Sequence, residues 1–203
     1  MIIDYSEESI LQISFALKNH QNVCIPTDTV YGLIAASSSE KAVRNIFKLK
    51  KRSFKSPLAM LCKDINQAKK YIIHSDLFEK LSVFWPGALT LICKQNPSNN
   101  FKTATSGLDT IGIRVPKSEI IHKIIDIIQE PIFATSVNIS GTKPIQNPIE
   151  MDSLFGNKIL ILRYLNEQNN QIPSTIIDIS NKTPFILRDG LLTKDNINNI
   201  VCK

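Results

Sequence analysis

The residues best suited to binding anions are gathered in one segment of the sequence. Eight basic residues and no acidic residue occur between positions 41 and 63: Lys41, Arg44, Lys48, Lys50, Lys51, Arg52, Lys55 and Lys63. Such a cluster can bind phosphate, because Arg offers a planar fork of donors and Lys a compact charge. It can equally be a solvated helix face whose cations stabilise the C-terminal end of the helix. Charge alone favours the second interpretation, so the choice depends on the neighbouring residues.

Small polar side chains fall on one face of three predicted strands, since successive residues of a strand point to opposite sides. The residues concerned are Thr110, Gly112 and Arg114, then Ser136 and Asn138, then Ser174 and Asp178. An exposed sheet face would carry Lys, Glu and Thr. Small hydroxyls, an amide, a glycine and single arginines are instead typical of a pocket that contacts a ligand. We therefore expect these strands to line a binding pocket.

Several familiar site patterns are missing from the sequence. A phosphate-binding loop would need Lys and then Ser or Thr after its second glycine, but Gly112 is followed by Ile-Arg. The three histidines are isolated and suggest neither a base nor a metal ligand: His20, His74 and His122. No close pair of carboxylates indicates a metal site. Any phosphate is therefore expected to bind to basic side chains and hydroxyls.

The elements that must position these residues follow from caps and from hydrophobic periodicity. Helices are predicted over 7–19, 40–50, 64–72, 75–84, 118–129, 147–156 and from 193 onward. Short apolar runs predict strands over 23–25, 57–62, 88–94, 110–115, 132–139, 159–162, 175–179 and 184–187. Residues 96–107 and 166–170 are expected to be polar loops. Strands and helices alternate, so we expect an α/β fold with a mixed sheet, in one domain over residues 1–203.

Length and composition are those of one globular domain in a reducing compartment. The chain has 203 residues, 43% of them hydrophobic, and a formal charge of +6 that indicates anionic partners such as nucleotides or RNA. Four cysteines without a paired motif favour free thiols: Cys24, Cys62, Cys93 and Cys202. The N-terminus is unlike a signal peptide, and the most apolar stretch, 120–128, is interrupted by charges. We therefore expect a cytoplasmic protein that does not span a membrane.

Seven short motifs occur in order along the chain. They are PTDTVYGL at 26–33, the Lys50–Arg52 step with Pro57 and Leu58 after it, WPGALT at 85–90, TIGIRVP at 110–116, SVNISG at 136–141, STIID at 174–178 and Arg188-Asp189-Gly190. Together they resemble the YrdC-like threonylcarbamoyl-AMP synthase family, in its short single-domain form, over about residues 8–190. The resemblance implies a twisted open α/β sheet with flanking helices around a large basic cavity.

The resemblance also implies a reaction and its substrates. L-Threonine and bicarbonate or CO2 would give N-carboxy-threonine, which attacks the α-phosphate of ATP and releases pyrophosphate. Other proteins would transfer the threonylcarbamoyl group of the product to an adenosine of tRNA. Such a nucleotidyltransferase mainly positions its substrates and neutralises phosphate charge, with Mg2+ carried by ATP and no prosthetic group.

Functional residues of the family map onto definite positions of this chain. By resemblance, Lys50 and Arg52 would hold the triphosphate during catalysis. The implied contacts of ATP are Lys50, Arg52, Ser56, Thr110, Asn138 and Arg188. The implied contacts of threonine are Thr29, Arg114, Ser136 and Ser174, with Arg114 forking the carboxylate. The resemblance implies no metal ligand from the protein.

Two rival hypotheses stay open at this point. A module that binds double-stranded RNA or tRNA without catalysis fits the positive charge, although aromatic residues make up only 7% and no RNA-binding signature occurs. A related carbamoyl-adenylate chemistry could also use the same site with a different amine donor. Dependence on threonine separates the second rival from the synthase.

Overall fold

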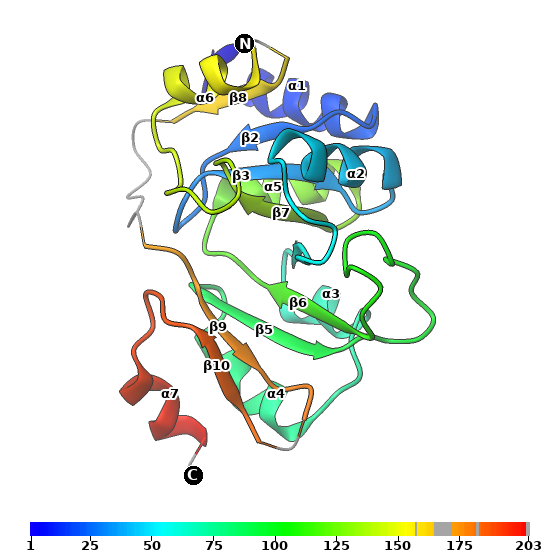
Figure 1. Ribbon diagram of the computed structural model, residues 1–203, viewed down its shortest axis with the longest axis vertical. Helices are drawn as coiled ribbons and strands as arrows, with labels where there is room; N and C mark the ends of the chain where they lie inside the picture. Colours follow the sequence, from blue (N-terminus) through cyan, green and yellow to red (C-terminus); the bar gives the residue numbers. More distant parts are fainter. Residues whose placement is uncertain (157, 165–171, 182, 202–203) are drawn as a thin grey trace.

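One mixed sheet runs through the whole molecule (Figure 1). The computed structural model describes residues 1–156, 158–164, 172–181 and 183–201. The strand order is β1-β8-β2-β3-β7-β4-β6-β5-β9-β10. The strands are β1 (Ile2–Asp4), β2 (Val23–Ile25), β3 (Gly32–Ala36), β4 (Ala59–Leu61), β5 (Leu89–Lys94), β6 (Thr110–Arg114), β7 (Ile132–Ser136), β8 (Leu160–Arg163), β9 (Thr175–Asp178) and β10 (Phe185–Arg188). The α/β fold with a mixed sheet is thus confirmed.

Seven α-helices accompany the sheet in the described part of the chain, and their caps explain where they begin. They are α1 (Glu7–Lys18), α2 (Glu40–Leu49), α3 (Ile65–Lys69), α4 (Asp76–Leu81), α5 (Glu119–Ile128), α6 (Pro148–Phe155) and α7 (Lys194–Val201). The side chains of Ser6, Ser39 and Asp64 accept backbone N–H groups at the starts of α1, α2 and α3. Among the described residues, no helix has both the length and the apolar character needed to cross a bilayer.

The sequence pattern does not predict two of the strands. The five residues of β3 are all buried and lie between β2 and β7, so they lack the alternation that marks a half-exposed strand. The three residues of β1 pair in parallel with β8, a partner far along the sequence. The strand expected over 132–139 ends at Ser136, because the side chain of Asn138 bonds to the carbonyls of Ile139 and Thr142 and turns the chain. The loop expected over 166–170 lies outside the described residues.

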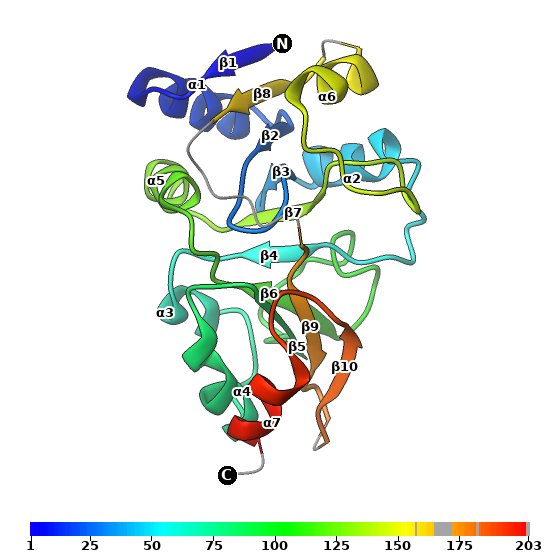
Figure 2. The same cartoon turned by 90° about the vertical axis from the view of Figure 1, so that its left-hand side faces the viewer.

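Two hydrophobic cores cover the two faces of the sheet. Figure 2 shows α1 and α5 on one side of the upper strands and α2 and α6 on the other. Alternate residues of one strand separate accordingly: Ile132 and Ala134 belong to the core under α1 and α5, whereas Phe133 belongs to the core under α2. The helices therefore hold the central strands from both faces, and the ends of these strands are fixed in space.

The C-terminal end of α2 has the hydrogen bonds of a Schellman motif. The Arg52 N–H donates to Phe47 O at 2.8 Å and the Lys51 N–H donates to Lys48 O at 3.1 Å. Lys51 takes the left-handed conformation, with φ of 49°. This turn reverses the chain between Lys50 and Arg52, so that their side chains leave the helix end in different directions.

Candidate active site

A cavity of about 380 Å3 lies on the same face of the sheet as α1 and α5. Leu61 and Ala134 belong both to its wall and to the core under these helices. Strands β3, β4, β5, β6, β7, β9 and β10 all contribute to the wall. The described wall contains three guanidinium groups, those of Arg52, Arg114 and Arg188, and no carboxylate. It is therefore suited to an anionic ligand.

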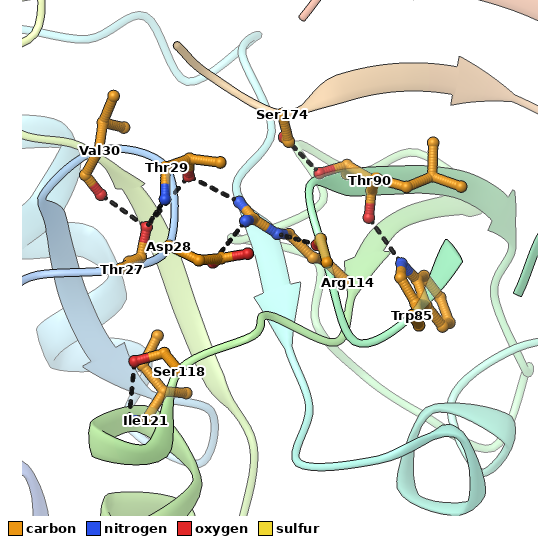
Figure 3. A network of polar contacts seen from close by, with 12 residues as sticks. Thr27, Asp28, Thr29, Val30, Trp85, Thr90, Arg114, Ser118, Ile121 and Ser174 are labelled. Atoms are coloured by element: carbon orange, nitrogen blue, oxygen red, sulfur yellow. Dashed lines mark hydrogen bonds and ion pairs between the residues drawn. The ribbon is translucent and has the colours of Figure 1, made fainter. Parts of the chain in front are cut away.

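Arg114, the last residue of β6, is held on three sides by protein groups (Figure 3). Its Nε donates to Gly87 O at 2.9 Å, one terminal nitrogen donates to Thr29 Oγ1 at 2.9 Å, and the other donates to Asp28 Oδ1 at 2.6 Å. The Arg114 side chain is only 7% exposed. Because a guanidinium has five N–H donors, these three bonds fix its plane and leave donors for a ligand.

Arg52 reaches the cavity from the turn after α2. Its Nε donates to Ser56 O and one terminal nitrogen donates to Pro57 O, both at 2.9 Å. The two bonds fold the loop 52–57 around the guanidinium. Arg52 is therefore oriented by its own loop, with its charge at the cavity wall.

The hairpin of β9 and β10 supplies the opposite wall. Arg188 donates from Nε and a terminal nitrogen to Ser174 O at 3.0 and 2.9 Å, and also to Ser174 Oγ at 3.1 Å. Thr90 Oγ1 on β5 lies 2.8 Å from the same Ser174 Oγ. Gly190 passes so close to this strand that a Cβ there would lie 2.4 Å from Pro173 O and from Thr175 N. Only glycine fits at that crossing, and it keeps Arg188 beside Ser174.

Lys50 lies behind the wall, where its side chain is almost completely enclosed. Only 1% of the residue is exposed, and Nζ donates to Ser136 O, to Asn138 O at 3.0 Å and to Asn138 Oδ1 at 2.6 Å. Three acceptors match the three N–H bonds of an ammonium. Burial, together with the charge of Arg52, lowers the pKa of Lys50 to about 7.

The three cavity arginines share one electrostatic environment. Burial lowers the pKa of each guanidinium, and for Arg188 the charges of Arg114 and Arg52 lower it further. Guanidinium stays protonated at neutral pH despite such shifts. Asp28 offsets the charge of Arg114, whereas Arg52 and Arg188 have no carboxylate partner among the described residues. The cavity therefore keeps a net positive charge, and an anion that enters it would relieve the repulsion between the arginines.

Most of the residues expected at the site do meet in this cavity. Its wall includes Thr29, Arg52, Arg114, Ser136, Asn138, Ser174 and Arg188. Lys50 and Ser56 are not in the described wall: Lys50 lies behind Ser136 and Asn138, and the Ser56 carbonyl accepts a hydrogen bond from Arg52. Thr110 lies at the other end of β6 from Arg114, pairs with Lys94 and is not in the described wall. Asp178 is also outside it and accepts the Ser180 N–H.

Three polar residues of the site received no role from the sequence. Thr27 and Asp28 belong to the PTDTVYGL segment and Thr90 to WPGALT, so the motifs contain them. Thr27 and Thr90 line the cavity, and Asp28 pairs with Arg114. Their contacts run to residues 84 or more positions away or across a tight turn, which spacing along one strand cannot reveal.

Comparisons with known proteins agree with this arrangement. A sequence model of the Sua5/YciO/YrdC family, described as "Telomere recombination", matches residues 16–190. A Methanocaldococcus jannaschii protein is 33% identical over 196 residues, which cover 94% of this chain and 92% of that protein. The threonylcarbamoyl-AMP synthase of Pyrococcus abyssi is 34% identical over 183 residues, which cover 88% of this chain and 53% of the relative.

Structural similarity extends over the whole chain. The crystal structure of P. abyssi Sua5 complexed with L-threonine has a TM-score of 0.92 and 32% sequence identity, and the match covers 99% of this chain and 61% of that one. The chain thus spans little more than half the length of the P. abyssi protein. With a family match over most of its length and a full-length structural match, the chain belongs to the Sua5/YciO/YrdC family.

Proposed function

We propose that this chain is an L-threonylcarbamoyladenylate synthase, a nucleotidyltransferase that acts as a single domain over residues 1–203. The observation that carries the proposal is the convergence of Arg52, Arg114 and Arg188 from three separate elements on one cavity. An amino acid and a nucleoside triphosphate are both anionic, and the reaction requires them side by side. The similarity to relatives named threonylcarbamoyl-AMP synthase supports this choice over an RNA-binding module without catalysis.

In the proposed reaction, ATP enters as its magnesium complex and its triphosphate lies against Arg52. The carboxylate of L-threonine meets the free donors of Arg114, while bicarbonate or CO2 supplies the carbamate carbon. The carbamate oxygen attacks the α-phosphorus, the bond to the bridging oxygen breaks, and pyrophosphate leaves. Buried guanidinium groups stabilise the charge that develops on the phosphate oxygens, since they are oriented before the reaction starts.

The site offers little general acid or base chemistry, and the proposed reaction needs little. A carbamate oxygen is already a nucleophile, so the enzyme has to align two anions and to neutralise a leaving pyrophosphate. Bonds from Arg52 to Ser56 O, and from Arg114 to Gly87 O, hold the two guanidinium groups without a ligand. Transfer of the product to tRNA by other proteins completes the proposed role.

Pyrophosphate release tests the proposal directly. The protein should release pyrophosphate only when L-threonine, bicarbonate and ATP are present together, and mass spectrometry should detect threonylcarbamoyl-AMP. Serine, valine and other amines in place of threonine test the rival chemistry with another donor. Equal release without threonine would exclude the synthase, and salt-sensitive RNA binding without ATP affinity would favour the RNA-binding module.

A further inference from the structure

Lys50, Asn138 and Ser136 form one continuous chain of hydrogen bonds that ends at the cavity. Asn138 Nδ2 donates to Ile139 O at 2.9 Å and to Thr142 O at 2.7 Å. Asn138 Oδ1 accepts from Lys50 Nζ at 2.6 Å and from Ser136 Oγ at 2.7 Å. The opposite amide orientation would turn the NH2 group towards an ammonium and the oxygen towards two carbonyls, so the contacts fix the assignment.

The side chain of Asn138 has no hydrogen-bonding capacity left for a ligand. Both of its N–H donors and both lone pairs of its oxygen are used within the protein, and the residue is only 6% exposed. Lys50 likewise directs three N–H bonds at three oxygens and is not part of the cavity wall. Both residues therefore act on the cavity through the group that they hold, which is Ser136.

The hydroxyl of Ser136 is consequently fixed in one direction. Its single proton points at Asn138 Oδ1, so the lone pairs of Oγ are what it presents to the cavity that it lines. Donation from a hydroxyl also makes its oxygen a better acceptor, because hydrogen bonds in a chain polarise one another. Ser136 thus offers an acceptor where a freely rotating serine would offer either a donor or an acceptor.

Thr29 is fixed in the same way on the far side of Arg114. Thr27 Oγ1 donates to Val30 O at 2.8 Å, so the 3.0 Å contact between the two threonine hydroxyls places the Thr29 proton on that bond. Arg114 then donates to the Thr29 oxygen (Figure 3). The wall therefore separates arginine donors from hydroxyl acceptors, which suits a ligand with both a carboxylate and an amino group.

We propose that Lys50 and Asn138 are positioning residues that hold the Ser136 hydroxyl as a hydrogen-bond acceptor for the α-amino group of the amino-acid substrate. This inference rests on the proposed function and differs from the direct ATP contact that the resemblance implies for Lys50 and Asn138. A substrate hydroxyl can match a serine in either direction, whereas an ammonium has donors only and is best served by an oxygen whose proton is committed. After the ammonium has released a proton to solvent, an N–H bonded to Ser136 leaves the nitrogen lone pair free to attack the carbon of CO2. The N–C bond forms as one C=O π bond opens onto oxygen, and the second proton of the nitrogen also passes to solvent, which leaves the carbamate.

Calorimetry with two ligands tests the direction of this bond. L-Threonine and (R)-3-hydroxybutanoate share the carboxylate and the β-hydroxyl, but the second lacks the amino group. Ser136→Ala should weaken L-threonine binding roughly 10- to 100-fold, as expected for a lost bond to a charged group, and leave the affinity for the analogue unchanged. Ser98→Ala, which removes a hydroxyl from the exposed loop 96–107, is the matched control and should alter neither affinity.

A double-mutant cycle tests whether Asn138 acts through Ser136. Asn138→Ala should weaken L-threonine binding, and adding Ser136→Ala to it should cause little further loss, since the hydroxyl has already lost its fixed direction. Thermal unfolding shows which variants are folded, and the Ser136→Ala measurement does not depend on the Asn138 variant. Equal weakening of both ligands by Ser136→Ala, or additive losses in the cycle, would overturn the inference. Wild-type protein that neither binds L-threonine nor releases pyrophosphate would overturn the proposed function as well.

Discussion

Each cavity arginine is already anchored by backbone carbonyls before any ligand is present. Arg52 bonds to Ser56 O and Pro57 O, and Arg188 bonds to Ser174 O through two N–H groups. A side chain anchored in this way loses little further freedom when an anion binds. The anchoring bonds also hold the positively charged guanidinium groups close together, an arrangement that burial alone would destabilise.

Arg52→Ala should therefore remove transition-state stabilisation that no neighbour replaces. We expect kcat/KM for pyrophosphate release to fall at least about 100-fold, the usual loss when an oriented charge-stabilising donor is removed. Arg52→Lys should recover part of the rate, because it restores charge without the fork. Lys55→Ala, which removes an exposed neighbouring charge, serves as the control. A normal rate in Arg52→Ala would remove this residue from the site.

Among the elements, the C-terminal turn of α2 is the feature that separates Lys50 from Arg52. Residue Lys51 between them has φ of 49°, a conformation that costs about 1 kcal/mol for a residue with a Cβ. The end of α2 and the site are therefore formed by the same turn. The N–H groups of this turn donate hydrogen bonds to the last carbonyls of α2, and the turn places Lys50 behind the wall and Arg52 at the cavity.

Replacing Lys51 with glycine should stabilise the protein. Glycine adopts the left-handed conformation freely, so Lys51→Gly should raise the free energy of unfolding by about 0.5–1 kcal/mol. The same change three residues earlier, Lys48→Gly inside α2, should lower the free energy of unfolding by about 1 kcal/mol. Chemical denaturation measures both. Destabilisation by Lys51→Gly would contradict the assigned turn.

Gly190→Ala should have a much larger effect than an alanine at a glycine that has open space around it. Its Cβ would collide with backbone atoms of Pro173, Ser174 and Thr175, so β9 must move and Arg188 with it. We expect a loss of about 2 kcal/mol or more in the free energy of unfolding, together with weaker ATP or threonine binding. Gly107→Ala, with φ of +78° and open space around its Cβ, should cost only about 1 kcal/mol. Equal costs would argue against the close crossing.

The sequence predicts most of the elements and much of the cavity, because local rules govern both. Side-chain caps mark the starts of α1, α2 and α5, and period-two alternation places Arg114 and Ser136 on the ligand face. These local rules do not predict contacts between residues that are far apart in the sequence. Strand β1 exists only because β8 lies beside it, and the enclosure of Lys50 depends on carbonyls 86 and 88 positions away.

Over the whole molecule, buried ionisable groups link folding to pH. The folded state lowers the pKa of Lys50 from 10.5 to about 7, so above pH 7 the unfolded chain binds more protons than the folded one. Stability should therefore rise with pH between about 7 and 9. Burial raises the pKa of the Cys24, Cys62 and Cys93 thiols, so above about pH 9 the unfolded chain ionises first and stability should fall.

Denaturation at a series of pH values measures this profile. Lys50→Met removes the group responsible for the rise, so the variant should show a flat profile between pH 7 and 9 while keeping the decline above it. The control variant Lys48→Met, which replaces an exposed lysine, should keep both the rise in stability between pH 7 and 9 and the decline above it. An identical rise in Lys50→Met and wild type would assign the effect to another group.

The hairpin of β9 and β10 lies at one end of the sheet, where β10 is the last strand among the described residues (Figure 2). Two of the expected site residues, Ser174 and Arg188, thus lie at this end of the sheet, whereas Arg114 and Ser136 lie on strands nearer its middle. Peripheral strands open at lower free energy than central ones. We therefore expect the hairpin of β9 and β10 to open at lower free energy than the central strands, which would uncover Arg188 and Ser174 while Arg114 and Ser136 stay in place.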